Sequence, residues 1–204
     1  CLFALAAALV GCSGSKSFSK KGAKLDEAGL YAEAAGMFEQ AAQRSQKNVD
    51  AKIGLKKTGQ LLLNDKLGSF FKEMAMGSAK GEAVAVYLDA KAYQERIQRL
   101  GVVLEIPDHY KADFDRVKGE HLVDLYNEGQ ALLGKQEYGA AEQVFARIAK
   151  IEPNYKDANS LQAVAYSEPL YRTGKVDLAD GRYRKAYAAL DKVVAKDAGY
   201  KDAA

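Results

Sequence analysis

Apolar residues recur along most of this chain at intervals of three and four, which is the spacing of one face of an α-helix. In the clearest pattern, a tyrosine is followed by alanine after three positions and by phenylalanine or leucine after seven. The pattern occurs as Tyr31, Ala34, Phe38; as Tyr138, Ala141, Phe145; and as Tyr183, Ala186, Leu190. No series of alternating apolar and polar residues suggests a sheet, so the sequence predicts an all-α protein.

The helical pattern belongs to a longer internal repeat. The string Tyr155-Lys156-Asp157-Ala158 returns as Tyr200-Lys201-Asp202-Ala203, 45 positions later. The same offset relates Gly129 to Gly174 and Tyr126 to Tyr171. Recognisable units lie near residues 15–48, 122–155 and 167–200. A degenerate fourth unit, near 64–97, has Phe71 in place of the glycine and Lys80 in place of the tyrosine.

These units resemble the tetratricopeptide repeat (TPR), a helix-turn-helix of about 34 residues. The resemblance implies that helix A of each unit contains a glycine where the neighbouring helix crosses closely, and that a second glycine forms the turn to helix B. The crossing glycines would be Gly22, Gly129 and Gly174, and the turn glycines Gly29 and Gly181. We therefore expect residues 17–204 to form a right-handed, TPR-like solenoid of helical hairpins.

The offset of 45 exceeds the usual repeat length by about 11 residues, which is close to three helical turns. Whole extra turns lengthen a helix without rotating its apolar face, so the sequence predicts extended A helices at 49–76 and 108–134. A third, at 156–180, is expected to be interrupted near Pro169, with Ser167 as a cap. Residues 101–107 lack helical character and are predicted to form a linker or a short strand-like turn.

The chain begins with an uncharged apolar run, Cys1–Val10. Ten apolar residues are about half of what a membrane-spanning helix needs, but they fit the core of a secretory signal peptide. The run ends in Leu9-Val10-Gly11-Cys12, which resembles the lipobox of bacterial lipoproteins. A buried N-terminal helix with inert cysteines is the other interpretation.

The lipobox resemblance implies a signal peptide at residues 1–11, truncated at its N-terminus. It also implies that Cys12 is lipidated, that residues 12–16 form a tether, and that N-terminal acyl chains hold the protein in a membrane. Because Ser13 follows the cysteine, the resemblance favours the outer membrane of a bacterial cell envelope, with the protein facing the periplasm.

Charge and cysteine content narrow the classes of function. Thirty basic side chains against 27 acidic ones leave a net charge of +3, which is too balanced to predict nucleic-acid binding. Both cysteines lie within the first 12 residues, so the body of the protein has no disulfide framework. Four lysines precede the first acid, and they either approach anionic lipid head groups or belong to a solvated tether: Lys16, Lys20, Lys21 and Lys24.

No group of residues suggests catalysis or a cofactor. His109 and Asp113 share a helix face, but no further ligand completes a metal site. The sequence contains no nucleophile elbow, no phosphate-binding glycine-rich loop and no Cys–His pair. We therefore expect a protein that is not an enzyme, with no catalytic, metal or cofactor residues.

The TPR resemblance implies that the A helices line a concave groove in which a protein or peptide partner binds. Four residues are expected to face it: Tyr126, Gln130, Tyr171 and Lys175. Tyrosine provides a large, rigid contact surface at little entropic cost. The other interpretation is that both tyrosines pack between the lengthened helices.

The sequence thus predicts a membrane-anchored TPR scaffold that binds a partner in a bacterial envelope assembly. The alternative is an N-terminal accessory repeat region of a longer envelope protein. In that case a missing C-terminal domain would carry an enzymatic or polymer-binding activity.

Overall fold

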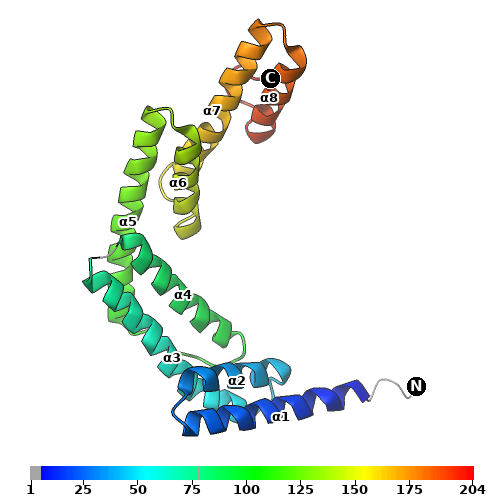
Figure 1. Cartoon of the computed structure of the whole chain (residues 1–204), viewed down its shortest axis with the longest axis vertical. Helices are drawn as coiled ribbons and strands as arrows, with labels where there is room; N and C mark the ends of the chain where they lie inside the picture. The colour runs from blue at the N-terminus through cyan, green and yellow to red at the C-terminus, as the bar shows by residue number, and fades with distance from the viewer. Residues whose placement is uncertain (1–5, 78) are drawn as a thin grey trace. The chain divides into compact units, whose positions relative to one another are not determined.

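The computed structural model describes residues 6–77 and 79–204, with side chains from residue 14 onward (Figure 1). The chain forms two compact units, of which unit 1 ends at Lys118 and unit 2 runs from Gly119 to Ala204. No strand occurs among the described residues, so the all-α prediction is confirmed. The helices are α1 (Ala6–Glu27), α2 (Tyr31–Arg44), α3 (Val49–Ala75), α4 (Lys80–Gln98), α5 (Asp108–Gly134), α6 (Tyr138–Ile151), α7 (Ala158–Ala179) and α8 (Tyr183–Lys196).

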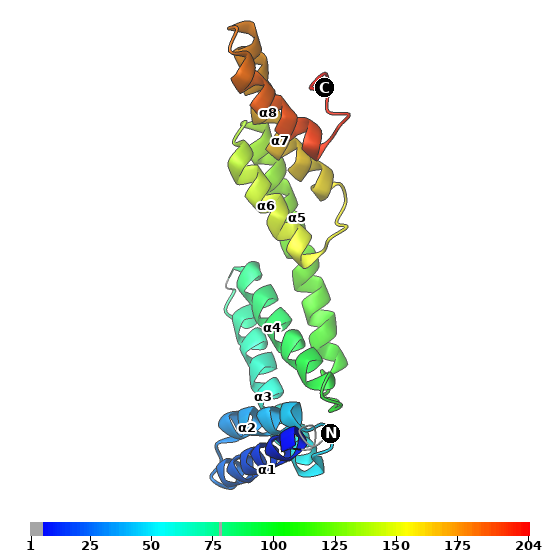
Figure 2. The ribbon, with the colours of Figure 1, turned by 90° about the vertical axis from the view of Figure 1, so that its right-hand side faces the viewer.

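Within each unit, consecutive helices pack on one another. In unit 1, α2 packs against α1 and α3, and α3 also packs against α4. In unit 2, α7 packs against α6 and α8. Figures 1 and 2 show α1 beside α2 and α7 beside α8 in both views.

The two predicted long helices are confirmed, since α3 and α5 coincide with 49–76 and 108–134 to within one residue. Residues 101–107 are non-helical, as predicted. Their side chains alternate, with Val102, Leu104 and Ile106 buried and Val103 exposed. Side chains rather than a neighbouring strand satisfy several backbone groups here, since Gln60 accepts from the Glu105 N–H at 2.8 Å and donates to its carbonyl at 2.9 Å.

The glycines predicted at helix crossings lie against large side chains of the neighbouring helix. A Cβ atom added at Gly22 would lie 3.0 Å from the Phe38 ring, and one at Gly129 would lie 2.7 Å from the Phe145 ring. At Gly174 it would lie 2.6 Å from Leu190. Real Cβ atoms are not found this close to other heavy atoms in the last two cases, so the helices approach because these residues are glycine.

Three of the turns between helices have the same hydrogen bonds. The second residue after the end of each helix is left-handed, with φ of 76° at Gly29, 63° at Gln136 and 72° at Gly181. The next N–H bonds back across the turn, from Leu30 to Leu25, from Glu137 to Leu132 and from Arg182 to Asp177, at 2.8–2.9 Å. This is the Schellman arrangement that ends a helix. Gln136 was not predicted as a turn residue because glycine occupies the position in the two other units.

The predicted interruption of the third long helix is wrong. The α7 helix runs from Ala158 to Ala179 with Pro169 inside it, and Ser167 is buried rather than capping a helix end. Proline removes one backbone hydrogen bond. The helix continues because Ala165 and Gly174, on either side of the proline, are both packed against neighbours.

Two further expectations differ from the structure. Phe71, expected at a helix crossing, is 53% exposed, whereas Phe70 is buried with its ring 5.2 Å from that of Tyr87. An aromatic ring cannot occupy the space that a glycine leaves at a helix crossing. The adjacent residue, Phe70, therefore makes the contact with Tyr87 of the next helix. Residues 12–16, expected to be a tether, are part of α1, and Ser15 is buried because its hydroxyl donates to the Ala41 carbonyl at 2.7 Å.

Candidate functional site

An open cleft of about 670 Å³ lies between α1 and α3 in unit 1. Small residues, Ser19 and Ala23 on α1 and Gly54 on α3, line its walls, and Phe38 from α2 lies between them. Ile53 adds an apolar side chain that is 65% exposed. The cleft therefore combines an apolar interior with access from solvent, which suits the binding of a side chain from another molecule.

One end of the cleft is held by a hydrogen-bonded cluster around Asn48. Its side-chain oxygen accepts the Ala51 N–H at 3.0 Å and so caps α3. Its amide nitrogen donates to Ser15 at 2.8 Å and to Ser19 at 2.9 Å. Because both serines are buried on α1, this cluster fixes the separation of α1 and α3.

A second apolar groove, of about 490 Å³, adjoins the cleft through Ile53. It lies between α3 and the segment 101–103, and Val49 and Val103 line it with 65% and 61% of their surfaces exposed. The Lys56 ammonium donates to the Val103 carbonyl, which holds the segment against α3. Cleft and groove together form a continuous apolar surface, which we call the unit 1 surface.

Lysines surround the unit 1 surface on both sides. Lys16 and Lys20 line it from α1, and Lys52, Lys56 and Lys57 line it from α3. Lys57 pairs with Asp26 at 2.8 Å, and Lys56 with Glu105 at 3.6 Å. Asp50 is the one acid among the residues that line the cleft. In the part of the chain that the structure describes, no carboxylate forms an ion pair with Lys16, Lys20 or Lys52.

The equivalent place in unit 2 is filled. Helices α2 and α6 match at an offset of 107 residues, as do Gly22 and Gly129 and the rings of Phe38 and Phe145. At this offset unit 2 has larger residues at the three small positions of the cleft, with Tyr126 for Ser19, Gln130 for Ala23 and Leu161 for Gly54. Tyr126 meets Phe145 edge-on, with ring centroids 6.4 Å apart.

The predicted site residues Tyr126 and Gln130 lie together in this filled region. Tyr126 is half-buried, its hydroxyl donates to Asp157 at 2.5 Å, and Gln130 donates to that hydroxyl at 3.2 Å. The hydrogen bond to Asp157 is the main reason that the pKa of Tyr126 is raised. The Lys156 ammonium lies 4.3 Å from the centre of the Tyr126 ring. The tyrosine thus joins α5 to the loop before α7, although part of its ring stays exposed.

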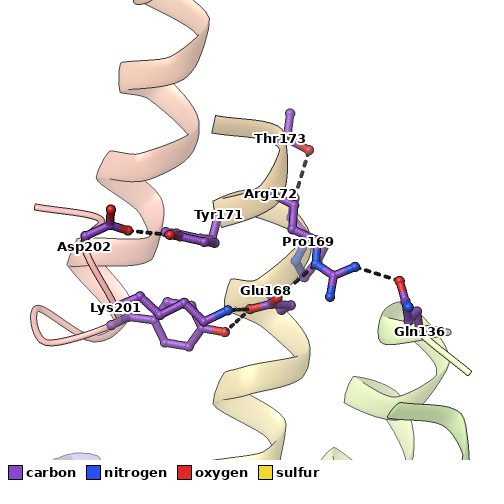
Figure 3. A network of polar contacts seen from close by, with 9 residues as sticks. Gln136, Glu168, Pro169, Tyr171, Arg172, Thr173, Lys201 and Asp202 are labelled. Atoms are coloured by element: carbon purple, nitrogen blue, oxygen red, sulfur yellow. Dashed lines mark hydrogen bonds and ion pairs between the residues drawn. The ribbon is translucent and has the colours of Figure 1, made fainter. Parts of the chain in front are cut away.

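Tyr171 and Lys175 make the same kind of contact one repeat later, and Figure 3 shows Tyr171 pointing at Asp202. The Tyr171 hydroxyl and the Lys175 ammonium, the latter at 3.0 Å, both donate to Asp202. These two bonds lower the pKa of the Asp202 carboxyl. The structure therefore places the four predicted residues in two equivalent clusters of unit 2. In each cluster, the predicted tyrosine bonds to the aspartate of the repeated Tyr-Lys-Asp string, Asp157 or Asp202.

A buried carboxylate, Glu168, was not predicted (Figure 3). It accepts from Tyr200 and Lys201, each at 2.5 Å, and from Arg172 at 2.9 Å. Burial alone would raise the pKa of Glu168, but the hydrogen bonds from these three residues lower it to about 2. Two of its partners, Tyr200 and Lys201, lie 32 and 33 positions away in the sequence. The preceding repeat has Val123 at this position, so the repeat pattern contained no signal for the carboxylate.

Other candidate chemistry is sparse in the described residues. Among them, no three His, Cys, Asp or Glu side chains lie close enough to hold a metal ion. None of the described helices combines the length and the hydropathy required to cross a bilayer. The side chain of Cys12, the predicted lipidation site, lies outside the described part of the structure.

Comparison with known proteins found no match among protein-family models, curated proteins or solved structures.

Proposed function

We propose that this protein is a membrane-anchored scaffold of TPR-like repeats that binds a segment of a protein partner in a bacterial envelope assembly. The observation that carries the proposal is the unit 1 surface, an open apolar cleft between two A helices. Unit 2 has the same helical framework with this place filled, so an open cleft is not a requirement of the fold. Exposed apolar surface of this kind is typical of an interaction site.

Repeated local geometry supports the TPR-like, right-handed solenoid. Three helical hairpins have a glycine at the crossing point and a Schellman turn between their helices. Their second helices, α2, α6 and α8, each contain 14 residues. Repetition of crossing and turn is what a solenoid needs in order to stack one hairpin on the next.

The anchor rests on the N-terminal sequence. The string Leu9-Val10-Gly11-Cys12 supports lipidation of Cys12, and Ser13 supports the outer membrane, with the scaffold in the periplasm. Tyr126, Gln130, Tyr171 and Lys175 provide a second contact area, on unit 2, through the exposed edges of their side chains.

Site-specific cross-linking tests the role of the unit 1 surface. Ile53 is replaced by a photo-reactive benzoylphenylalanine in the full, anchored chain in living bacteria, and the cross-linked partner peptide is identified by mass spectrometry. We expect one discrete partner segment from Ile53 and none from the same probe at exposed Lys150 on α6. The product should disappear when Ala23→Trp fills the cleft and persist with the matched control Ala23→Ser.

Equal products from Ile53 and Lys150 would contradict the proposal. So would a product that Ala23→Trp leaves unchanged while circular dichroism shows the fold intact.

A further inference from the structure

We infer that the unit 1 surface binds an acidic amphipathic segment of a partner, whose apolar side chains enter the cleft while its carboxylates pair with Lys16, Lys20 and Lys52. The inference deepens the proposed function and rests on it. Its two physical components are the exposed apolar residues and the lysines around them.

The apolar component is concentrated in one place. Val49, Ile53 and Val103 each expose more than half of their surface, and all three line the groove next to the cleft. Val49 and Ile53 are four residues apart on α3, so they lie on the same helix face. A partner with two apolar side chains about one helical turn apart would cover both.

The lysines are not needed to build the fold. At the offset of 107 residues, unit 2 has Val123 for Lys16, Asn127 for Lys20 and Asn159 for Lys52. The framework of unit 2 forms without a positive charge at any of these positions. These lysines are therefore available for a contact that unit 1 makes and unit 2 does not.

The arrangement of charge matches a segment with acids on two sides of an apolar centre. Lys16 and Lys20 are one turn apart on α1, across the cleft from Ile53 on α3. On the α3 side, the Lys52 side chain is half-buried. Nearby acids neutralise only part of the surface, since Asp26 pairs with Lys57, Glu105 pairs with Lys56, and Asp50 lies on the edge of the cleft.

The shape favours a peptide over a lipid surface. Lysines and exposed apolar residues next to an expected anchor would also suit anionic lipids. However, a bilayer is flat on this scale and cannot follow a cleft, whereas single side chains of a polypeptide can enter it.

The probe is a fluorescein-labelled dodecapeptide with two leucines four residues apart and glutamate at the flanking positions. Binding to the full chain is measured by fluorescence anisotropy. Two matched peptides have lysine in place of every glutamate, or serine in place of both leucines. We expect the glutamate–leucine peptide to bind at least tenfold more tightly than either, with an affinity that falls as salt is raised.

Charge reversal localises the binding. The double variant Lys16→Glu with Lys20→Glu should lower the affinity for the glutamate–leucine peptide at least tenfold. Lys150→Glu with Lys192→Glu, which makes the same change in net charge on exposed positions of unit 2, should leave its affinity unchanged. Thermal melting confirms that both double variants remain folded.

Other outcomes overturn the inference. It fails if the three peptides bind equally, if both double variants weaken binding equally, or if vesicles of phosphatidylglycerol bind through Lys16 and Lys20 while the peptide does not. If the cross-linking at Ile53 yields a partner segment without acids, the inference fails and the proposed function stands. If that cross-linking yields no specific partner, the proposed function itself fails.

Discussion

At the scale of single residues, small side chains determine how close the helices come and where space remains. The Phe38 ring is the best example, because it lies against Gly22 of α1 and against Gly54 of α3. A Cβ atom at Gly54 would lie 2.3 Å from the ring, well inside any normal contact distance. Phe38 and the two glycines therefore position three helices and one wall of the cleft.

The substitution Gly54→Ala should be destabilising, whereas Gly68→Ala on the same helix should not. Overpacking a core contact typically costs about 1–3 kcal/mol. Gly68 is exposed and nothing lies near its missing Cβ, so alanine there should stabilise the protein by roughly 0.5–1 kcal/mol through helix propensity. Urea denaturation measures both changes in the free energy of unfolding.

If Gly54→Ala were as stable as the unmodified protein, the close contact with Phe38 would be excluded. Recovery of stability in the double variant Gly54→Ala with Phe38→Leu would identify the ring as the source of the strain.

Part of this packing could be predicted from the sequence. Gly22, Gly129 and Gly174 each lie 12 residues before the alanine of the tyrosine–alanine pattern, so their position at helix crossings could be predicted. Gly54 was not, because the repeat has Leu161 in its place and periodicity identifies only what recurs. The cleft was not predicted for the same reason, because it lies where the residues of unit 1 are smaller than the matching residues of unit 2.

At the scale of helices, residues typical of helix ends predict some of the observed helix boundaries and not others. Ser167 and Pro169 have the composition of a helix start, and on that basis a break in α7 was predicted. Packing outweighs the signal, because Ala165, Ser167 and Glu168 are all buried on one continuous helix. By contrast, the ends at Gly29 and Gly181 were predicted correctly, since a left-handed glycine stops a helix whatever surrounds it.

Glu168 should make the stability of unit 2 depend on acidity. Its pKa is lowered from an ordinary 4.5 to about 2, so the ionised carboxylate stabilises the folded state fully above pH of about 4.5. This contribution is lost as the pH falls from there toward 2. At pH 7, Glu168→Gln should lower stability by about 1–3 kcal/mol, because three donors lose a charged acceptor.

Chemical denaturation at several pH values between 7 and 2 tests this. The difference between Glu168→Gln and the unmodified protein should shrink toward the acid end of the range. Glu128→Gln, on the exposed side of α5, is the matched control and should be nearly silent throughout. A Glu168→Gln difference that stays constant down to pH 2 would contradict the assignment of the carboxylate as ionised.

At the scale of the whole molecule, one helical framework is used for two different surfaces. Unit 2 fills its repeat positions with tyrosines that bind aspartates of the following loops. Unit 1 leaves the matching positions small and surrounds them with lysines. The predicted site residues therefore lie on the more closed of the two surfaces.

Lipidation of Cys12 is the prediction that concerns the whole chain. Expressed with a complete signal peptide, the protein should fractionate with membranes and carry the mass of acyl chains on Cys12. Two buried acyl chains are enough for stable anchoring, since each methylene contributes about 0.8 kcal/mol. Cys12→Ser should release the protein, while Cys1→Ser should not, and an unchanged membrane fraction for Cys12→Ser would exclude this anchor.

The packing of helices against their near neighbours in the chain has a consequence for biosynthesis. Contacts of short sequence separation require little loop closure, and proteins rich in them fold quickly. A chain that leaves a ribosome or a translocation pore N-terminus first has every residue of unit 1 available once Lys118 has emerged. Unit 1 can then fold while the rest of the chain is still in transit. The cleft between α1 and α3 would then be complete before the helices of unit 2 have formed.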